Sequence, residues 1–226
     1  MSTDAAARAE PVRRLVFFDL DGTIARRDTL VPYVARYLWS HPWRVWRLAA
    51  VLPPLLGFAL GRGDRGTLKG ALIRAAMDGV TAQEIETWNL CFLPRLLEVG
   101  LFPDALAAIA KHRGSGDRLI LMSASVDLYV PEIGRRLGFD QAICSGVAWT
   151  AGRLDGRLRT LNCRDEEKAR CFRTVTLEYP GLPTMAYGNS ASDLPHMVLA
   201  TEAVMVNPAH ALRVKAEALG IACVRW

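Results

Sequence analysis

A short apolar run near the start of the chain, Leu15 to Leu20, ends directly in the residues Asp-Gly-Thr. A run of this length that is stopped by turn residues is typical of a strand buried on both faces, as in a parallel sheet. Two carboxylates, Asp19 and Asp21, lie at its end. Ligands bind at the carboxyl ends of strands in open α/β sheets. The run therefore predicts an α/β fold with a polar site at this edge of the sheet.

The residues that follow divide into a helical part and an alternating part. From Asp28 to about Leu101 the pattern is mostly helical, Pro42 can begin a second helix, and Thr81-x-x-Glu84 forms a capping box. Apolar strands then alternate with helices, which implies a parallel sheet covered on both faces. The expected elements are strands at 119–122, 142–144, 184–187 and 203–206, helices at 104–111 and 127–137, and a β-hairpin at 147–158.

These elements predict a doubly wound α/β core with an inserted helical cap. The core comprises residues 1–27 and about 102–226, and the cap comprises residues 28–101. Hydrophobic residues make up 51% of the 226, which is enough to bury a core of this size.

The positive charge of the chain is concentrated in the predicted cap. The segment from Thr29 to Gly70 contains six basic residues and one acid, Asp64, so it carries the whole formal charge of +5. Any anionic partner is therefore expected there. The basic residues stand among aliphatic ones and no nucleic-acid motif occurs, which disfavours nucleic-acid binding. The basic residues are Arg36, Arg44, Arg47, Arg62, Arg65 and Lys69.

Cysteine usage and hydropathy predict a cytoplasmic protein. The five cysteines form no C-x-x-C pair, which is typical of reduced thiols. No apolar run precedes Leu15, so we expect a short mobile tail and no secretory signal. The segment Leu48 to Leu60 has no charge, but it is shorter than the roughly 20 residues of a spanning helix. The pair Pro53-Pro54 is expected to break a helix there, so we predict that the segment does not span a membrane.

The two carboxylates at the first strand favour a cation and a phosphate. Buried carboxylates without a counter-charge are costly, so Asp19 and Asp21 predict a bound cation. An aspartate can also attack phosphorus and form an acyl phosphate. The alternative is a strand followed by an ordinary Asp-Gly turn. Likewise Ser123 can simply end a strand, Lys168 can begin a solvated charged helix, and Asp193 can cap a helix.

The order of these residues resembles the motifs of the haloacid dehalogenase superfamily of phosphohydrolases. The segment DLDGT is similar to its first motif, and LILMSAS supplies the Ser123 of the second. Lys168, in NCRDEEKARC, is similar to the lone lysine of the third. The segment MAYGNSASDLPHM is similar to the fourth and supplies Asn189 and Asp193. The resemblance covers nearly the whole chain.

The resemblance implies a magnesium-dependent phosphatase with a covalent aspartyl-phosphate on Asp19. It implies that Asp21 is the general acid and base, and that Lys168 balances the negative charge that develops. Ser123 and nearby backbone N–H groups, that of Ala124 among them, would hold the phosphate. The implied ligands of Mg²⁺ are Asp19, the main-chain carbonyl of Asp21 and residue 189, with Asp193 close by. Family members commonly have Asp where this chain has Asn189, so we expect weaker binding of Mg²⁺.

The predicted cap leaves the substrate open. It resembles the small helical cap of the subclass that includes phosphoserine phosphatase, in which Asp28 would contact the substrate; capping of the next helix is an equal alternative. Trp39, Trp43 and Trp46, interleaved with arginines, precede the apolar segment and suit a membrane interface. This arrangement resembles the cap of bacterial phosphatidylglycerophosphate phosphatases. The alternative is that the tryptophans pack inside the cap and the arginines are solvated.

Two partner classes therefore remain, a lipid head group and a small phosphorylated metabolite such as phosphoserine or histidinol phosphate. With a lipid, the protein would contact the inner face of the membrane peripherally. A phosphotransferase and a non-catalytic binding protein are further alternatives. The latter is disfavoured by the retention of the motif residues Asp19, Asp21, Ser123, Lys168 and Asp193.

Overall fold

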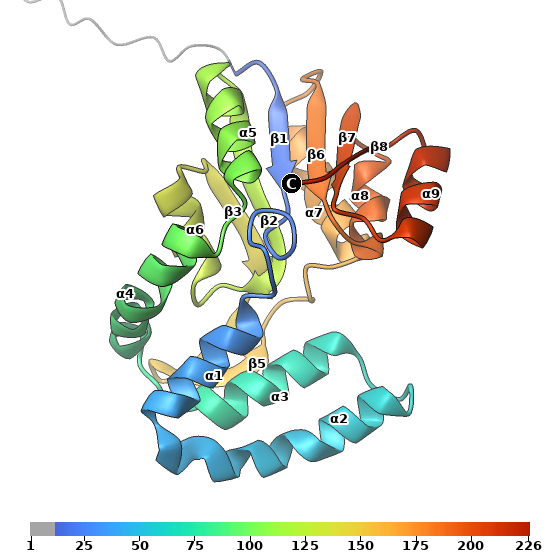
Figure 1. The fold of residues 1–226 in the computed structure, drawn as a ribbon. Coiled ribbons are helices and arrows are strands. Elements are labelled where there is room, and N and C mark those ends of the chain that lie inside the picture. The colour runs from blue at the N-terminus through green and yellow to red at the C-terminus, as the bar shows by residue number, and fades with distance from the viewer. Residues whose placement is uncertain (1–11) are drawn as a thin grey trace, which may run out of the picture.

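The computed structural model describes residues 12–226, and the predicted tail at residues 1–11 lies outside the described residues. A six-stranded parallel sheet, in the order β3-β2-β1-β6-β7-β8, forms the centre of the molecule (Figure 1). The prediction of a doubly wound α/β fold is therefore confirmed. The strands are β1 (Leu15–Phe18), β2 (Arg118–Val126), β3 (Gln141–Ser145), β6 (Thr184–Gly188), β7 (Glu202–Val206) and β8 (Ala222–Val224).

Alternate residues of the central strands pack on opposite faces of the sheet. Phe17 contacts Phe172 on one face, with ring centroids 4.5 Å apart. Phe18 stacks on Tyr187 on the other face, at 4.4 Å. Because both faces are covered by helices, β1 is fully buried, as the apolar run predicts. The covering helices are α5 (Pro103–Gly114), α6 (Val130–Leu137), α7 (Glu166–Glu178), α8 (Leu194–Met197) and α9 (His210–Ala218), and the short 3-10 helix η2 (Ala191–Asp193) precedes α8.

The helical insertion, residues 28–101, lies beyond the carboxyl ends of the strands (Figure 1). Its entry and exit run side by side, because the N–H of Arg26 donates to Gly100 and the N–H of Phe102 donates to Ile24, both at 2.9 Å. Among residues 12–226, no helix combines the length and the apolar character needed to cross a membrane. The insertion contains α1 (Leu30–Ser40), the 3-10 helix η1 (Pro42–Val51), α2 (Leu52–Ala59), α3 (Arg65–Met77) and α4 (Ala82–Val99).

Most predicted helix starts in the insertion are confirmed, and one expectation is wrong. Pro42 begins η1, and Thr81 and Glu84 form the predicted capping box at the start of α4. The pair Pro53-Pro54 does not break a helix, because it stands in the first turn of α2, where a missing N–H is tolerated.

The structure also corrects several boundaries in the sheet region. β1 ends at Phe18, so Asp19 belongs to the loop that follows the strand. β2 continues past Met122 to Val126. Asp104 does not cap α5, because Phe102 precedes the helix and Pro103 is its first residue. The sequence pattern did not predict α9 and β8, which complete the sheet at one edge.

The hairpin of β4 (Val147–Thr150) and β5 (Arg153–Leu158) packs on α3 of the insertion. It turns at Ala151-Gly152, as predicted, but Gly156 lies within β5 instead of in a second turn. Gly156 has φ +82°, and a Cβ there would lie 2.5 Å from the Cα of Arg74 in α3. This close approach requires a glycine, since any side chain would push the hairpin away from the helix.

Replacing Gly156 by alanine should therefore destabilise the protein more than replacing Gly152. Gly152 also has a positive φ, +73°, but no atom lies within 4 Å of the position that a Cβ would occupy, so it controls for the backbone cost alone. We expect Gly152→Ala to lower the free energy of unfolding by about 1 kcal/mol and Gly156→Ala by about 3 kcal/mol. Urea denaturation measures both. Equal losses would show that the hairpin does not depend on this contact with α3.

Candidate active site

A cleft of about 650 Å³ is lined by residues from the carboxyl ends of the strands and from the insertion. Seven of the eight predicted site residues line it. The eighth, Ser123, is fully buried and directly precedes Ala124 in β2. Parallel strands end at one edge of the sheet, so residues far apart in sequence meet there. The seven are Asp19, Asp21, Asp28, Ala124, Lys168, Asn189 and Asp193.

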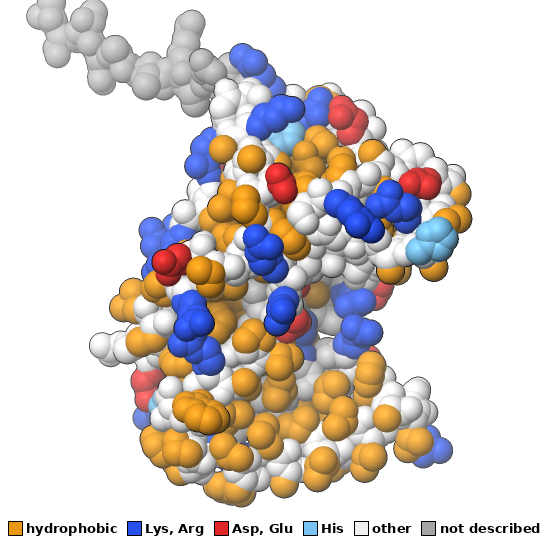
Figure 2. All heavy atoms as spheres, viewed as in Figure 1, with side chains coloured by type: hydrophobic (Ala, Val, Ile, Leu, Met, Phe, Trp, Pro, Cys, Tyr) orange, Lys and Arg blue, Asp and Glu red, His pale blue; other side chains and the backbone are white. Residues whose placement is uncertain are grey.

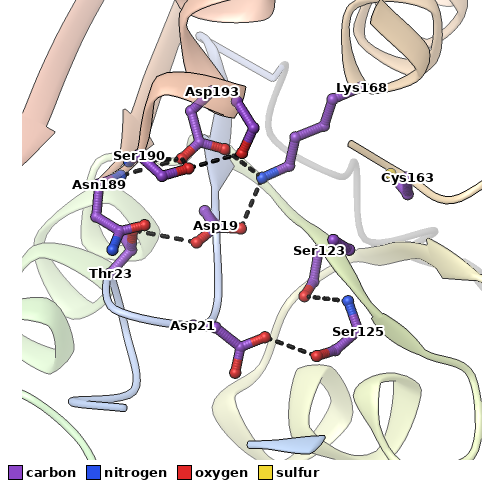
Figure 3. A network of polar contacts seen from close by, with 12 residues as sticks. Asp19, Asp21, Thr23, Ser123, Ser125, Cys163, Lys168, Asn189, Ser190 and Asp193 are labelled. Atoms are coloured by element: carbon purple, nitrogen blue, oxygen red, sulfur yellow. Dashed lines mark hydrogen bonds and ion pairs between the residues drawn. The ribbon is translucent and has the colours of Figure 1, made fainter. Parts of the chain in front are cut away.

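Lys168 forms two ion pairs at the floor of the cleft. Its Nζ lies 2.6 Å from Oδ1 of Asp19 and 2.6 Å from Oδ1 of Asp193 (Figure 3). Its side chain is only 2% exposed, so the alternative of a solvated helix start does not hold for this lysine. The first turn of α7 presents the lysine, the loop after β1 presents Asp19, and η2 presents Asp193.

Burial acts differently on the three charged groups. It raises the pKa of Asp19 to about 7, and the ion pair with Lys168 opposes this rise only partly. Burial also works against charge on Asp193, but Lys168 and His196 outweigh it and lower the pKa of Asp193 to about 2. For Lys168 burial favours the neutral amine, but the two carboxylates outweigh it and its pKa is raised. Asp193 is therefore the permanent counter-charge of the lysine.

Both carboxylate oxygens of Asp193 are occupied. Oδ1 accepts from Lys168, and Oδ2 accepts from the N–H groups of Asn189 and Ser190 at 3.1 and 3.0 Å. The hydroxyl of Ser190 donates to the same Oδ2 at 2.9 Å. These bonds fix the loop after β6, so Asp193 is suited to orient its neighbours more than to bind a metal directly.

The carboxyl group of Asp21 joins the first loop to the insertion and to β2. Its Oδ1 accepts from both the N–H and the hydroxyl of Thr29 at 2.7 Å. Its Oδ2 accepts from the hydroxyl of Ser125 at 2.6 Å. Burial raises the pKa of Asp21, and hydrogen bonds from Ser125 and Thr29 moderate the rise. A carboxyl group whose pKa is raised and whose position is fixed is suited to donate a proton.

Ser123 is buried in β2 beside Ala124, which lines the cleft. The Oγ of Ser123 accepts from the N–H of Ser125 at 3.0 Å, which leaves its own proton available for a ligand.

Asp28, at the rim, accepts from the N–H of Val31 at 2.9 Å, which is the bond expected of a residue that caps the first turn of α1.

Asn189 lies close to the first loop. A Cβ on Gly22 would lie 2.0 Å from Nδ2 of Asn189, so the glycine of the first motif makes room for this side chain. Figure 3 shows the amide of Asn189 pointing towards the loop that carries Asp19 and Thr23. Oδ2 of Asp19 is the less engaged oxygen, since it accepts only a 3.3 Å bond from Thr23 among the described residues.

These donors fit a magnesium ion. Within residues 12–226 no group of three or more His, Cys, Asp or Glu residues is arranged to hold a metal. Mg²⁺, however, often binds through one or two carboxylates and retains several waters. The carboxylate of Asp19, the amide oxygen of Asn189 and the main-chain carbonyl of Asp21 supply oxygen ligands of the kind that Mg²⁺ prefers.

Lys69 is a site residue that the sequence did not reveal. It reaches from α3 into the cleft, where its Nζ donates to Oδ1 of Asn162 at 2.7 Å and to the carbonyl of Ala124. Burial lowers the pKa of Lys69 to about 8, despite the charges of Asp21 and Asp28. In the sequence it was one of six basic residues in a helical segment, and no pattern separated it from the others.

The profile of the haloacid dehalogenase-like hydrolase family matches residues 16–197. The chain belongs to this family. CicA of Caulobacter vibrioides is 34% identical over 196 residues, which cover 83% of each chain. A probable phosphatase of Mycobacterium tuberculosis is 31% identical over 219 residues, covering 94% of this chain and 75% of the relative. A probable phosphoserine phosphatase from Vibrio cholerae has the same fold, with a TM-score of 0.70 and 16% identity over 93% of this chain and 60% of that one.

Removal of the lysine charge should strongly destabilise this family member. Lys168→Met leaves Asp19 and Asp193 buried without their counter-charge, so we expect the free energy of unfolding to fall by about 3–5 kcal/mol. Lys111→Met, at an exposed position of α5, is the matched control and should change it by less than about 0.5 kcal/mol. Chemical denaturation followed by circular dichroism measures both. A loss below about 1 kcal/mol for Lys168→Met would contradict the role given to the ion pairs.

Proposed function

We propose that the protein is a magnesium-dependent phosphatase that hydrolyses a phosphate monoester through an aspartyl-phosphate on Asp19. The observation that carries this proposal is the position of Asp19. It lies in the cleft at the carboxyl end of the central strand β1, and it forms an ion pair with a buried lysine that is also paired with Asp193. Membership of the hydrolase family and the likeness to a probable phosphatase support it.

The two oxygens of Asp19 have different tasks in this reaction. Oδ1 is held by Lys168, which keeps the carboxylate oriented. Oδ2 accepts only a long bond from Thr23 among the described residues, so it is the oxygen that attacks phosphorus. The bond from phosphorus to the ester oxygen breaks as the bond to Oδ2 forms. Asp21 gives its proton to the departing oxygen, for which its raised pKa is suited.

The second half of the reaction reverses the role of Asp21. Its carboxylate takes a proton from the water that attacks the phosphorus of the aspartyl-phosphate, and inorganic phosphate leaves. The hydroxyl of Ser123 and the N–H of Ala124 hold phosphate oxygens, and Lys168 stabilises the charge that develops on them. Bound Mg²⁺ would offset the repulsion between Asp19 and the anionic phosphate.

We further propose that the substrate is a phospholipid such as phosphatidylglycerophosphate. The walls that the insertion contributes to the cleft combine apolar residues with cations, which suits a molecule with a phosphate and an acyl chain. A second groove of about 710 Å³ shares Arg26, Arg27 and Asp28 with the cleft and extends along α4, with Phe92 and Leu96 in its lining. The insertion contributes Leu30, Val31, Leu68, Leu72 and Arg65 to these walls, and the core contributes Arg26 and Arg27.

A phosphatase assay with Mg²⁺ tests both parts of the proposal. We expect release of phosphate from phosphatidylglycerophosphate in detergent, and slower release from phosphoserine, histidinol phosphate and an aryl phosphate. Asp19→Asn should lower every rate by at least about 10³-fold, because the nucleophile is lost. Asp104→Asn, exposed on α5, is the control and should be unchanged.

The possible results of this assay test the mechanism and the lipid substrate separately. Full activity of Asp19→Asn would overturn the mechanism. Activity on soluble esters alone, abolished by Asp19→Asn, would retain the phosphatase and exclude the lipid substrate. Transfer of phosphate to an added alcohol in preference to water would assign a phosphotransferase instead.

Residue 189 should determine the Mg²⁺ concentration at which the rate is half-maximal. Asn189→Asp adds a negative charge to the ligand set, so the Mg²⁺ concentration for half-maximal rate should fall about tenfold. Asn189→Ala removes the amide oxygen and should raise that concentration. Initial rates over a Mg²⁺ titration measure both variants. If neither variant shifts the half-maximal concentration, residue 189 is not a ligand.

A further inference from the structure

The outer side of the helical insertion presents large apolar side chains to solvent. Neither η1 nor α2 contains a buried residue, which is unusual for segments so rich in Trp and Leu. Figure 2 shows hydrophobic side chains gathered over the lower part of the molecule, where η1 and α2 lie in Figure 1. The most exposed are Trp39 (87%), Trp46 (76%), Leu60 (68%), Trp43 (65%), Leu56 (61%) and Leu52 (56%); we call these six residues the apolar face.

The apolar face is continuous along the chain. Trp39 lies at the end of α1, and Trp43 and Trp46 lie in η1. Leu52 and Leu56 are four residues apart on one side of α2, and Leu60 directly follows this helix. The alternative that the three tryptophans pack inside the insertion is wrong, since each is more than half exposed. The segments that carry most of this face, η1 and α2, lie on the side of the insertion away from the sheet (Figure 1).

Two of the neighbouring arginines fix this face to the rest of the insertion. Arg44 donates to the carbonyls of Ala76 and Asp78 at 3.2 and 3.0 Å. Arg47 forms an ion pair with Asp78 at 2.7 Å. These arginines hold η1 against the end of α3, so they are anchors and not solvated charges. The sequence could not show this, because Asp78 is distant along the chain.

The charge around the apolar face is mainly positive. The sequence contains no acidic residue from Thr29 to Gly63. Arg62 and Arg65 are exposed where α2 ends and α3 begins, beside Leu60. An apolar surface bordered mainly by cations, with Asp64 as the acid between Arg62 and Arg65, complements a surface that offers both acyl chains and negative head groups. Tryptophan is the residue most suited to such an interface, because its ring is apolar and its N–H is polar.

We propose that the apolar face binds the surface of a lipid bilayer that contains anionic lipid. A second copy of the chain fits this face less well, because a symmetric contact would place the arginines of the two copies near one another. The lipid surface instead neutralises them. This inference goes beyond the proposed hydrolysis, since it involves none of the residues assigned to the reaction and holds for either substrate class.

Flotation of the full-length protein with vesicles tests the proposal without any substrate. Vesicles of phosphatidylcholine with about 30% phosphatidylglycerol should carry the protein, and phosphatidylcholine alone should carry much less. The triple variant Trp39→Ser, Trp46→Ser, Leu56→Ser should reduce the partition coefficient by at least about 100-fold. The control variant changes exposed apolar residues elsewhere, Leu161→Ser and Leu177→Ser, and should bind like the unchanged protein.

A charge reversal tests the electrostatic part. Arg62→Glu should weaken binding to the anionic vesicles about tenfold, and added salt should reduce the difference. Arg173→Glu, exposed on α7, is its control and should have no effect. Far-UV circular dichroism confirms that each variant is folded.

Three results would overturn the proposal. The first is equal flotation of the triple variant and the unchanged protein, and the second is no flotation of either. The third is a protein mass in solution that doubles with concentration for the unchanged chain but not for the triple variant. That result would assign the face to a second copy. Loss of vesicle binding with retained hydrolysis of a soluble ester would leave the proposed function intact.

Discussion

The site depends on the ion pairs of one lysine, Lys168, with Asp19 and Asp193. A charged group removed from water is costly, and none of these three is tolerable alone in the interior. The three charges stabilise one another only where α7, the loop after β1 and η2 meet. The order of the strands in the sheet brings these segments together. The arrangement is also asymmetric. Asp193 is saturated with donors, and Asp19 keeps one oxygen that is nearly free to react.

The sequence was informative where function follows from the position of strands. Asp19, Lys168 and Asp193 could be grouped, because the ends of parallel strands share one edge and the motifs occur in order. Lys69 and Thr29 could not, because their contacts depend on how the insertion is placed over that edge. The roles of Arg44 and Arg47 were missed for the same reason. The strand β8 has three residues and only partial burial, so it leaves no hydrophobic pattern to detect.

The insertion has two chemically different sides. Towards the sheet it contributes Lys69 and Thr29, each hydrogen-bonded to a residue of the core. Away from the sheet it carries tryptophans and leucines without any buried residue in η1 or α2. The helix α3 lies between the two, and it also receives the hairpin at Gly156. The insertion thus combines contacts to the site, contacts to the hairpin and an exposed apolar side in one segment of the chain.

The bonds from Thr29 to Asp21 couple the shape of the molecule to its acid chemistry. Thr29 is the residue directly before α1. It follows the two hydrogen-bonded connections that join the insertion to the core. If the insertion moved away from the sheet, the N–H and hydroxyl of Thr29 would no longer donate to Oδ1 of Asp21. Of the bonds described above, only the one from Ser125 would then hold the carboxyl group. In the proposed reaction, Asp21 would therefore be held in place to give its proton only while the insertion lies over the carboxyl ends of the strands.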